Sequence, residues 1–387
     1  MKYIPYGRQF IDSKDKKLIL SSLSNDLITT GPFVEKFERD LKKYLNCKYS
    51  YTCSSGTAAI HLAMLSIGLK KDDIILMPAI NFIASYNMAK IIGSKVFLVD
   101  VDEFTGQITP EKILHCIKKN KLKKIKALLT MYHGGYPENI EKFYEIKKKY
   151  NFLIIEDACH ALGSEYKYRN NFFKIGSCKH ADISTFSLHP LKTITSGEGG
   201  IVTTNNAKIA KNIKLFRSHG ILRNKQKHWA YDVVRHGFNY RLSDINCALG
   251  LSQLKKINFF LKKRRMIYQK YLKEFKNFSS NIITPKYSKN IKSSYHLFLL
   301  NIKFDKLNKN KDNFLKYLKK NNIVAQQHYI PIYKFTIYNR KSTNFYGAEK
   351  YFNNSISTPI FVNLNNINQN KVIKIIKNYF KLKNKKI

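Results

Sequence analysis

Short apolar segments alternate with amphipathic segments from about residue 48 to residue 220, and this alternation restricts the possible folds most strongly. The apolar runs "DIILMPAI", "SKVFLVDV", "IKALLTMYH" and "NFLIIEDA" are typical of buried strands. Between them, "GTAAIHLAMLSIGL", "FIASYNMAKIIG" and "NIEKFYEIKKKY" carry apolar residues at helical spacing. This order of elements predicts a mostly parallel sheet with helices on both faces.

The spacing of predicted strands and helices changes after residue 250. The run "RLSDINCALGLSQLKKINFFLKKRRMIYQKYLKEF" is long enough to bridge two domains as one bent helix or as two helices. Beyond it, "YHLFLLNIKF" and "NQNKVIKIIKNYFKLK" indicate a smaller α/β unit. Because 387 residues exceed one small core, we expect a large domain at 1–250, with an N-terminal arm, and a small domain at 251–387.

The formal net charge of +43 raises the question of a nucleic-acid partner. Basic residues recur at helical spacing along the chain, as in "EKFYEIKKKY" and "LKKRRMIYQKYLKEF", and do not gather in one stripe. No zinc-finger or RRM signature accompanies them. We therefore interpret the basic residues as solvated helix faces and expect no nucleic-acid partner.

Cysteine usage and hydropathy further restrict the class of protein to which this sequence can belong. The 6 cysteines form no CxxC or CxxH pair, which argues against a zinc site, and we expect no metal. No apolar run approaches the length of a membrane span. The start, "MKYIPYGRQFIDS", lacks the apolar core of a secretory signal. We expect a cytoplasmic protein with no membrane partner.

Chemistry-bearing residues stand where predicted strands run into helices, which is where open parallel sheets bind ligands. In "CSSGTA", Gly56 and Thr57 begin a helix whose free N–H groups and dipole suit a phosphate. The alternative is an ordinary N-cap, because serine is favoured there. In "IIEDACHALGSEY", Asp157 ends an apolar strand and needs a positive partner, such as a protonated ring nitrogen. His160 is near enough to reach the same ligand, and a capping role for Asp157 is the alternative.

Two further segments carry candidate site residues. "STFSLHPLKTITSGEGG" delivers Lys192 into a glycine-rich loop beside the Ser187 hydroxyl. Imine chemistry needs an amine that loses its proton near neutral pH, and confinement beside another cation lowers a lysine pKa accordingly. In "GFNYRLSDINCALG", Asn239 and Arg241 precede an N-capped helix. Arg241 is suited to clamp a phosphate or, alternatively, to pair with a surface acid.

A phosphate seat, a desolvated aspartate and a confined lysine together match the requirements of pyridoxal phosphate. The motifs "SLHPLKTITSGEGG", "EDACHALGSEY", "SSGTAAIHLA" and "FNYRLSDINCALGLSQL" resemble the DegT/DnrJ/EryC1/StrS family of sugar-nucleotide aminotransferases, over nearly the whole chain. The resemblance implies an α/β protein with the type I fold of pyridoxal-phosphate-dependent transferases, which is aspartate-aminotransferase-like. It also implies a homodimer with its sites at the subunit interface.

The resemblance assigns roles to individual residues. Lys192 would bind the cofactor as an imine and then move the proton, Asp157 would pair with the pyridine nitrogen, and His160 would reach the ring hydroxyl. Further cofactor contacts are expected from Gly56, Thr57, Ser187, Phe82, which would stack on the ring, and the partner subunit's Asn239. Substrate contacts are expected from Arg241, His328 and Tyr329.

The resemblance also suggests a substrate. "ALGSEYKYRNNFFKIGSCKHAD" and "AQQHYIPIY" are similar to family members that aminate a UDP-linked 4-keto-6-deoxy-N-acetylhexosamine for pseudaminic acid biosynthesis. L-Glutamate would donate the amino group to C4 and leave as 2-oxoglutarate. The alternative is another nucleotide-sugar aminotransferase of the family, such as one making perosamine on a GDP-sugar. A sugar dehydratase of this fold is disfavoured, because those enzymes carry histidine at the position of Lys192.

Overall fold

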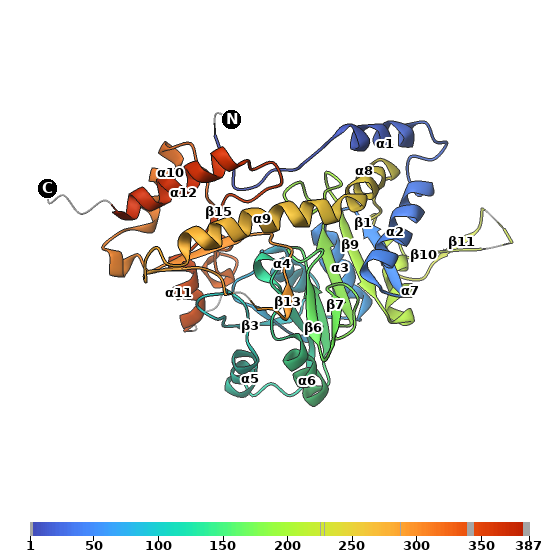
Figure 1. Ribbon diagram of the computed structural model, residues 1–387. Helices are drawn as coiled ribbons and strands as arrows, with labels where there is room; N and C mark the ends of the chain where they lie inside the picture. Colours follow the sequence, from blue (N-terminus) through green and yellow to red (C-terminus); the bar gives the residue numbers. More distant parts are fainter. Residues whose placement is uncertain (1–2, 225, 228, 287, 339–343, 382–387) are drawn as a thin grey trace.

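The computed structural model describes residues 3–224, 226–227, 229–286, 288–338 and 344–381 (Figure 1). Its centre is a 7-stranded sheet with the order β1-β9-β8-β5-β4-β2-β3. The bounds are Tyr49–Cys53 (β1), Ile74–Pro78 (β2), Lys95–Val99 (β3), Ile125–Met131 (β4), Leu153–Asp157 (β5), Ile183–Ser187 (β8) and Gly200–Thr204 (β9). The pairs β5–β8, β4–β5, β2–β4 and β2–β3 are parallel, and β9 runs antiparallel to both neighbours. The predicted mostly parallel sheet is confirmed.

Helices pack on this sheet as two separate apolar clusters. One cluster unites α3, α5, α6 and α7 with the strands, and the other joins α2 and α8 to β8 and β9. Proline begins two of these helices, where its missing N–H costs nothing. The bounds of the helices that surround the sheet are Ser13–Leu23 (α1), Pro32–Leu45 (α2), Gly56–Ser66 (α3), Ala84–Ile91 (α4), Pro110–Lys119 (α5), Ile140–Tyr150 (α6), Ala207–Arg217 (α7) and Asp244–Lys255 (α8).

The bridging run forms two helices, α8 and α9 (Ile257–Phe275), which meet at Lys256. In Figure 1, α9 crosses the molecule from the sheet helices toward the C-terminal helices. Its second half packs in a third apolar cluster with the small antiparallel sheet β12-β14-β15. The N-terminal segment joins the same cluster through Ile4, which bridges to Ile323. The division expected at residue 250 stays a prediction.

Two smaller sheets and several short elements complete the described chain. A hairpin, β10–β11, projects away from the molecule in Figure 1, and β13-β6-β7 forms a separate antiparallel sheet. The bounds are Glu165–Tyr168 (β6), Asn171–Lys174 (β7), Ile221–Arg223 (β10), Tyr231–Val233 (β11), Ile282–Ile283 (β12), Ile291–Lys292 (β13), Phe298–Ile302 (β14), Ser355–Thr358 (β15), Lys311–Lys320 (α10), Tyr346–Asn354 (α11) and Asn366–Lys381 (α12); the short 3₁₀ helices are His133–Gly135 (η1), Asp305–Leu307 (η2) and Ile332–Lys334 (η3).

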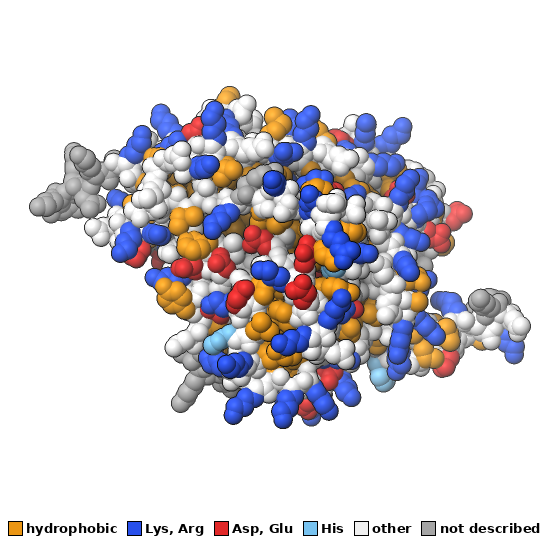
Figure 2. All heavy atoms as spheres, turned by 60° about the horizontal axis from the view of Figure 1, so that its bottom comes forward, with side chains coloured by type: hydrophobic (Ala, Val, Ile, Leu, Met, Phe, Trp, Pro, Cys, Tyr) orange, Lys and Arg blue, Asp and Glu red, His pale blue; other side chains and the backbone are white. Residues whose placement is uncertain are grey.

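The surface carries the charge in the scattered way that the sequence indicates. Figure 2 shows Lys and Arg spread over the face in view, with acidic side chains interspersed near its middle. Within the described residues, no helix has both the length and the apolar character that a membrane crossing needs.

Candidate active site

The site lies at the carboxyl edge of the central sheet. β5 ends at Asp157 and its parallel neighbour β8 ends at Ser187, with Asp157 in register with Thr185. Because parallel strands end at the same edge, the loops that follow them meet there. One loop leads from Asp157 to His160, and the other leads from Ser187 to Lys192. The structure thus brings together the predicted residues of these two motifs.

Gly56 and Ser187 form a close approach beside the N-terminus of α3. A Cβ placed on Gly56 would lie 2.8 Å from Ser187 Cβ and 3.1 Å from Ser187 Oγ. The preceding Ser55 caps the helix, and its hydroxyl accepts a hydrogen bond from Ala58 N–H at 3.0 Å. That bond leaves the N–H groups of Gly56 and Thr57 at the positive end of the helix dipole. The N-cap is confirmed, and phosphate binding by Gly56 and Thr57 stays a prediction, which a capped helix also allows.

Asp157 is a buried carboxylate with weak partners. It is 2% exposed, and its oxygens accept hydrogen bonds from Cys159 N–H at 3.2 Å and from Ser85 Oγ at 3.4 Å. Burial raises its pKa, while Cys159 and Lys192 lower it. None of the ion pairs within the described residues includes it. A buried carboxylate in this position favours a ligand that brings a cation.

Lys192 lies in a loop that is fixed by hydrogen bonds. The backbone N–H of Lys192 donates to His189 O at 2.9 Å, and the Thr195 hydroxyl donates to Leu188 O at 2.9 Å. Gly197 turns the loop with φ +78°, a conformation that favours glycine. Burial lowers the pKa of Lys192, and Arg264 lowers it further, while Cys159 and Asp157 raise it. The confinement and the second cation expected from the sequence are both present.

His160 is held inside a group of buried aromatic residues. Its Nε2 contacts the Tyr329 hydroxyl at 2.9 Å, and its Nδ1 lies 3.4 Å from Gly134 N. The His296 ring lies 4.2 Å from the His160 ring between centroids. Burial lowers the pKa of His160 well below its usual range, with a further contribution from Lys192. His160 is therefore neutral and can offer a hydrogen bond without adding charge to the site.

The predicted substrate residues differ in how closely the structure joins them to this group. Tyr329 contacts His160 directly, and the Phe82 ring lies 5.7 Å from the Tyr329 ring. His328 is buried, and its Nδ1 contacts Ser357 Oγ at 2.8 Å. Asn239 is exposed and pairs through its backbone with Ser218. Arg241 is half-buried on the same segment, and within the described residues no hydrogen bond or ion pair joins it to Lys192 or Asp157.

Sequence reasoning missed several members of the site: Ser85, His133, Cys159, Arg264 and His296. His133 follows β4 and its Nε2 lies 2.6 Å from the Tyr351 hydroxyl, which donates to His328 O at 2.9 Å. His133 closely follows β4, which lies next to β5 in the sheet, and this position in the sequence could have identified it as a site residue. The interpretation of the basic residues as solvated helix faces is wrong for Arg264, because this side chain is only 2% exposed.

These residues fit pyridoxal phosphate. The space that a Cβ on Gly56 would fill lies at a helix N-terminus beside a serine, which suits the phosphate. The buried Asp157 suits a protonated pyridine nitrogen, and the confined Lys192 suits an imine with the aldehyde. Gly56, Thr57 and Ser187 would hold one end of the cofactor, and Asp157 and His160 the other.

Comparisons with known proteins agree with this site. The sequence profile of the DegT/DnrJ/EryC1/StrS aminotransferase family matches residues 9–377. A Campylobacter jejuni subsp. jejuni (serotype O:23/36) protein, UDP-4-amino-4,6-dideoxy-N-acetyl-beta-L-altrosamine transaminase, is 38% identical over 356 residues, which cover 89% of this chain and 91% of that protein. GDP-perosamine synthase of Escherichia coli O157:H7 is 31% identical over 369 residues, which cover 95% of each chain.

Solved structures are similar over almost the whole chain. Helicobacter pylori PseC, an aminotransferase involved in the biosynthesis of pseudoaminic acid, superposes with a TM-score of 0.87 at 30% identity, covering 98% of this chain and 99% of its own. Streptococcus pneumoniae Spr1654 in its PMP form superposes with a TM-score of 0.88 at 24% identity, covering 97% and 99%, and it also occurs in a PLP form. The type I fold is confirmed, and membership of this aminotransferase family implies pyridoxal phosphate as the cofactor.

Proposed function

The chain belongs to the DegT/DnrJ/EryC1/StrS aminotransferase family, and on that premise we propose that it moves the amino group of glutamate to C4 of a UDP-linked 4-keto-6-deoxy-N-acetylhexosamine. It is a nucleotide-sugar aminotransferase that uses an amino donor. The observation that carries the chemistry is the shared sheet edge at which Asp157, Ser187 and the Lys192 loop meet. The preference for a UDP-sugar is supported by the 38% identity to the Campylobacter jejuni transaminase.

Bound pyridoxal phosphate supplies an electron sink for the charge that develops at the reacting carbon. Asp157 strengthens that sink by pairing with the protonated ring nitrogen. Its burial makes the pairing strong, because water does not screen it there. Tyr329 holds the neutral His160 through Nε2, which would place the imidazole beside the ring hydroxyl of the cofactor.

Lys192 is the group that moves protons. Once released from the cofactor, its amine takes a proton from the carbon of the amino donor, and in the second half-reaction it returns a proton to C4 of the sugar. Both steps need an amine that is neutral part of the time, and burial together with Arg264 provides this by lowering its pKa. The hydrogen-bonded loop keeps the amine within reach of both substrates.

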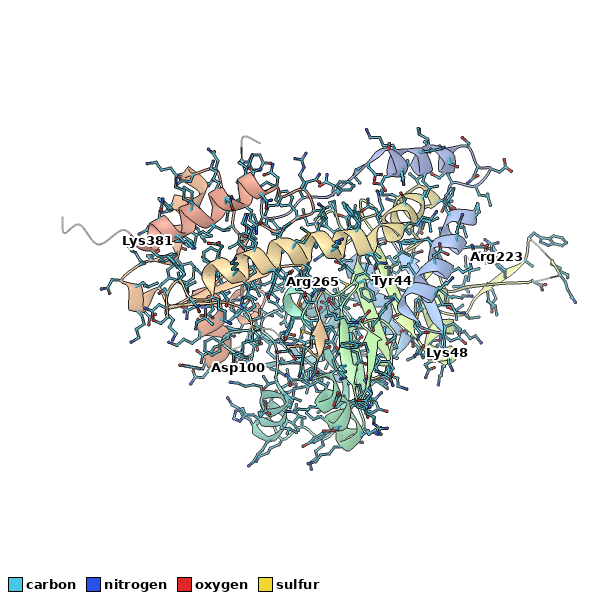
Figure 3. All side chains as sticks on the ribbon, viewed as in Figure 1. Tyr44, Lys48, Asp100, Arg223, Arg265 and Lys381 are labelled. Carbon is cyan, nitrogen blue, oxygen red and sulfur yellow. The ribbon has the colours of Figure 1, made fainter. Side chains whose placement is uncertain are left out.

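A homodimer is part of this proposal. The projecting hairpin exposes Leu222, Tyr231 and Val233 at 54%, 59% and 55%. Arg223, at the end of β10, is labelled on this hairpin in Figure 3. Apolar side chains on a projecting hairpin favour burial against a second subunit. The segment that follows would bring the partner subunit's Asn239 to the phosphate. Arg241 would contact the nucleotide sugar. Light scattering of the purified protein tests this, and a monomer would contradict it.

The decisive experiment offers the enzyme UDP- and GDP-linked 4-keto sugars separately, each with glutamate. Mass analysis of the sugar product reports whether oxygen at C4 has been replaced by an amino group. We expect conversion of the UDP-linked 4-keto-6-deoxy-N-acetylhexosamine. Preferential conversion of the GDP-linked sugar would favour the alternative, which the 31% identity to GDP-perosamine synthase supports. The cytoplasmic location stays a prediction.

A further inference from the structure

A cavity of about 420 Å³ lies where the loops after β3 and β4 meet α9 and the chain that follows it. Asp100, which is labelled in Figure 3, comes directly after β3 and begins the first of these loops. His133 lines the cavity from the second loop, and its ring lies 5.7 Å from the His160 ring. Of the described residues that line the cavity, none belongs to the Lys192 loop. The cavity is therefore a neighbour of the catalytic site and not a part of it, and its volume is typical of a small-molecule site.

The charge of this cavity is opposite to that of the chain as a whole. The sequence has 69 Lys and Arg against 26 Asp and Glu. Among the described residues that line the cavity, however, Asp102 and Glu138 are acidic and Lys286 is the one lysine or arginine. Lys286 is exposed, whereas both carboxylates are half-buried, so water screens the lysine more than it screens them. The cavity therefore has a negative potential, which favours a cation.

Glu138 is the carboxylate of this cavity that remains available to a ligand. Asp102 already accepts hydrogen bonds from the backbone N–H groups of Phe104 and Thr105, at 3.0 and 2.8 Å. Within the described residues, no hydrogen bond or ion pair includes the side chain of Glu138. Burial raises the pKa of Glu138, and Asp102 raises it further, while Lys286 lowers it. A ligand cation would offset both the burial and the repulsion between the two carboxylates.

Two buried residues of the cavity wall, His133 and Asn301, add acceptors that lack a donor. They are 2% and 5% exposed. The Tyr351 hydroxyl donates its hydrogen to His328 O and therefore accepts from His133 Nε2–H, which leaves Nδ1 as an unprotonated acceptor. Asn301 Nδ2 donates to Glu103 O at 2.9 Å, which leaves Oδ1 as the other acceptor. Neither Nδ1 nor Oδ1 has a hydrogen-bond partner within the described residues, so this wall favours a ligand that brings N–H donors.

Apolar side chains form much of the remaining wall and indicate the other half of the ligand. They include Phe104, Ile108, Tyr268, Leu297 and Leu299. Such a wall favours an apolar body, and the rings of Phe104 and Tyr268 also favour a cation. Nucleotides and other anions are disfavoured by the two carboxylates, so the sugar nucleotide is not the ligand of this cavity.

We propose that this cavity binds an organic cation that carries N–H donors on an apolar body, with its charged group at Glu138. The proposal goes beyond the proposed function and does not depend on it, because the residues that carry it are not those that hold the cofactor. The competing explanation is that water alone fills the cavity and solvates Glu138. The two explanations differ in whether a charged probe binds more tightly than a neutral probe of the same shape.

The first test measures the binding of three probes to the holoenzyme by titration calorimetry. Benzamidine is a cation with N–H donors on an apolar ring, benzamide is its neutral analogue and benzoate is the corresponding anion. We expect the dissociation constant of benzamidine to be at least about tenfold lower than that of benzamide, as for a hydrogen bond to a charged group, and no binding of benzoate. Absence of benzamidine binding, or equal affinity for benzamide, overturns the proposal.

The second test assigns the binding to Glu138 by substitution. Glu138→Gln removes the charge and keeps the shape, and Glu138→Asp keeps the charge. Glu141→Gln is the matched control, because Glu141 is an exposed acid in the first turn of α6 that does not line the cavity. The dissociation constant of benzamidine should rise about tenfold or more in Glu138→Gln, less in Glu138→Asp and not at all in Glu141→Gln. Equal affinity in Glu138→Gln and the unsubstituted enzyme, with an unchanged urea midpoint, overturns the proposal.

The third test locates the probe directly. Crystals of the holoenzyme are soaked in benzamidine, and the same soak is made with crystals of Glu138→Gln. We expect the amidinium within hydrogen-bond distance of the Glu138 carboxylate, with the ring against Phe104 or Tyr268, and an empty cavity in the variant. Benzamidine found at Lys192 or Asp157 and absent from the cavity would overturn the proposal and leave the proposed function untouched.

Discussion

Replacing Gly56 by alanine tests the phosphate seat with a steric change of known size. The new Cβ would lie 2.8 Å from Ser187 Cβ and 3.3 Å from Ser187 Cα, well inside normal contact distance. Because these atoms belong to a strand end and not to a flexible side-chain tip, α3 and β8 must separate. Overpacking of this kind costs about 1–3 kcal/mol of stability. We also expect pyridoxal phosphate to bind about tenfold more weakly, since a 1.4 kcal/mol loss corresponds to that factor.

A double-mutant cycle distinguishes the contact from a general loss of stability. Ser187→Gly removes the Cβ against which Ala would clash, so the Gly56→Ala, Ser187→Gly enzyme should recover stability relative to the sum of the single changes. Stability is read from urea unfolding of the cofactor-free protein, and cofactor affinity from absorbance titration. Affinity should not recover, because the Ser187 hydroxyl is lost. Additive stabilities in the cycle would refute the close approach between these residues.

Three further predictions concern the buried groups of the site. Asp157→Asn should keep the cofactor linked to Lys192 but lower kcat at least about 100-fold, because the amide cannot keep the ring nitrogen protonated; single-turnover kinetics check this. Burial lowers the pKa of His133 and of His328 to about 3, whereas unfolded histidine titrates near 6.5. The unfolded chain therefore binds more protons than the folded chain between those two pKa values. The free energy of unfolding should fall as the pH falls from about 6.5, by about 1.4 kcal/mol per pH unit for each histidine. Circular dichroism at stepwise lower pH measures this loss of stability, and a flat profile would contradict the burial of neutral histidines. Tyr351→Phe leaves His328 O and His133 Nε2 without their shared partner and should cost about 1–3 kcal/mol in urea unfolding, with an unchanged midpoint as the contrary result.

The parallel part of the fold could be predicted because β2, β3 and β4 are each followed by a helix. Apolar runs that end at Pro78, Val99, Met131 and Asp157 form neighbouring strands of one sheet. The reversal of β9 could not be predicted this way. It follows β8 through the Lys192 loop without an intervening helix.

The residues of the candidate site also differ in how far the sequence predicts them. Residues in loops directly after strands, such as Asp157 and Lys192, have a local signal because their types and positions are unusual together. His296 and Arg264 have no local signal for a role in the site, because tertiary packing alone brings His296, which precedes β14, next to His160 and brings α9 next to the Lys192 loop. Yet Arg264 shares helical spacing with the buried Phe260, Ile267 and Tyr271, so the period of α9 already indicated its burial. Counting it among solvated basic residues overlooked that period.

The central claim is that Lys192 alone, among many lysines, binds the cofactor as an imine. Borohydride reduction of the holoenzyme, followed by proteolysis and mass mapping, fixes the cofactor to the side chain that carries it. We expect one modified peptide, containing Lys192, and no modified lysine in the Lys192→Arg enzyme, which should retain cofactor without the bond. Stoichiometric labelling of a different lysine, or an unlabelled Lys192 in active enzyme, would contradict the account.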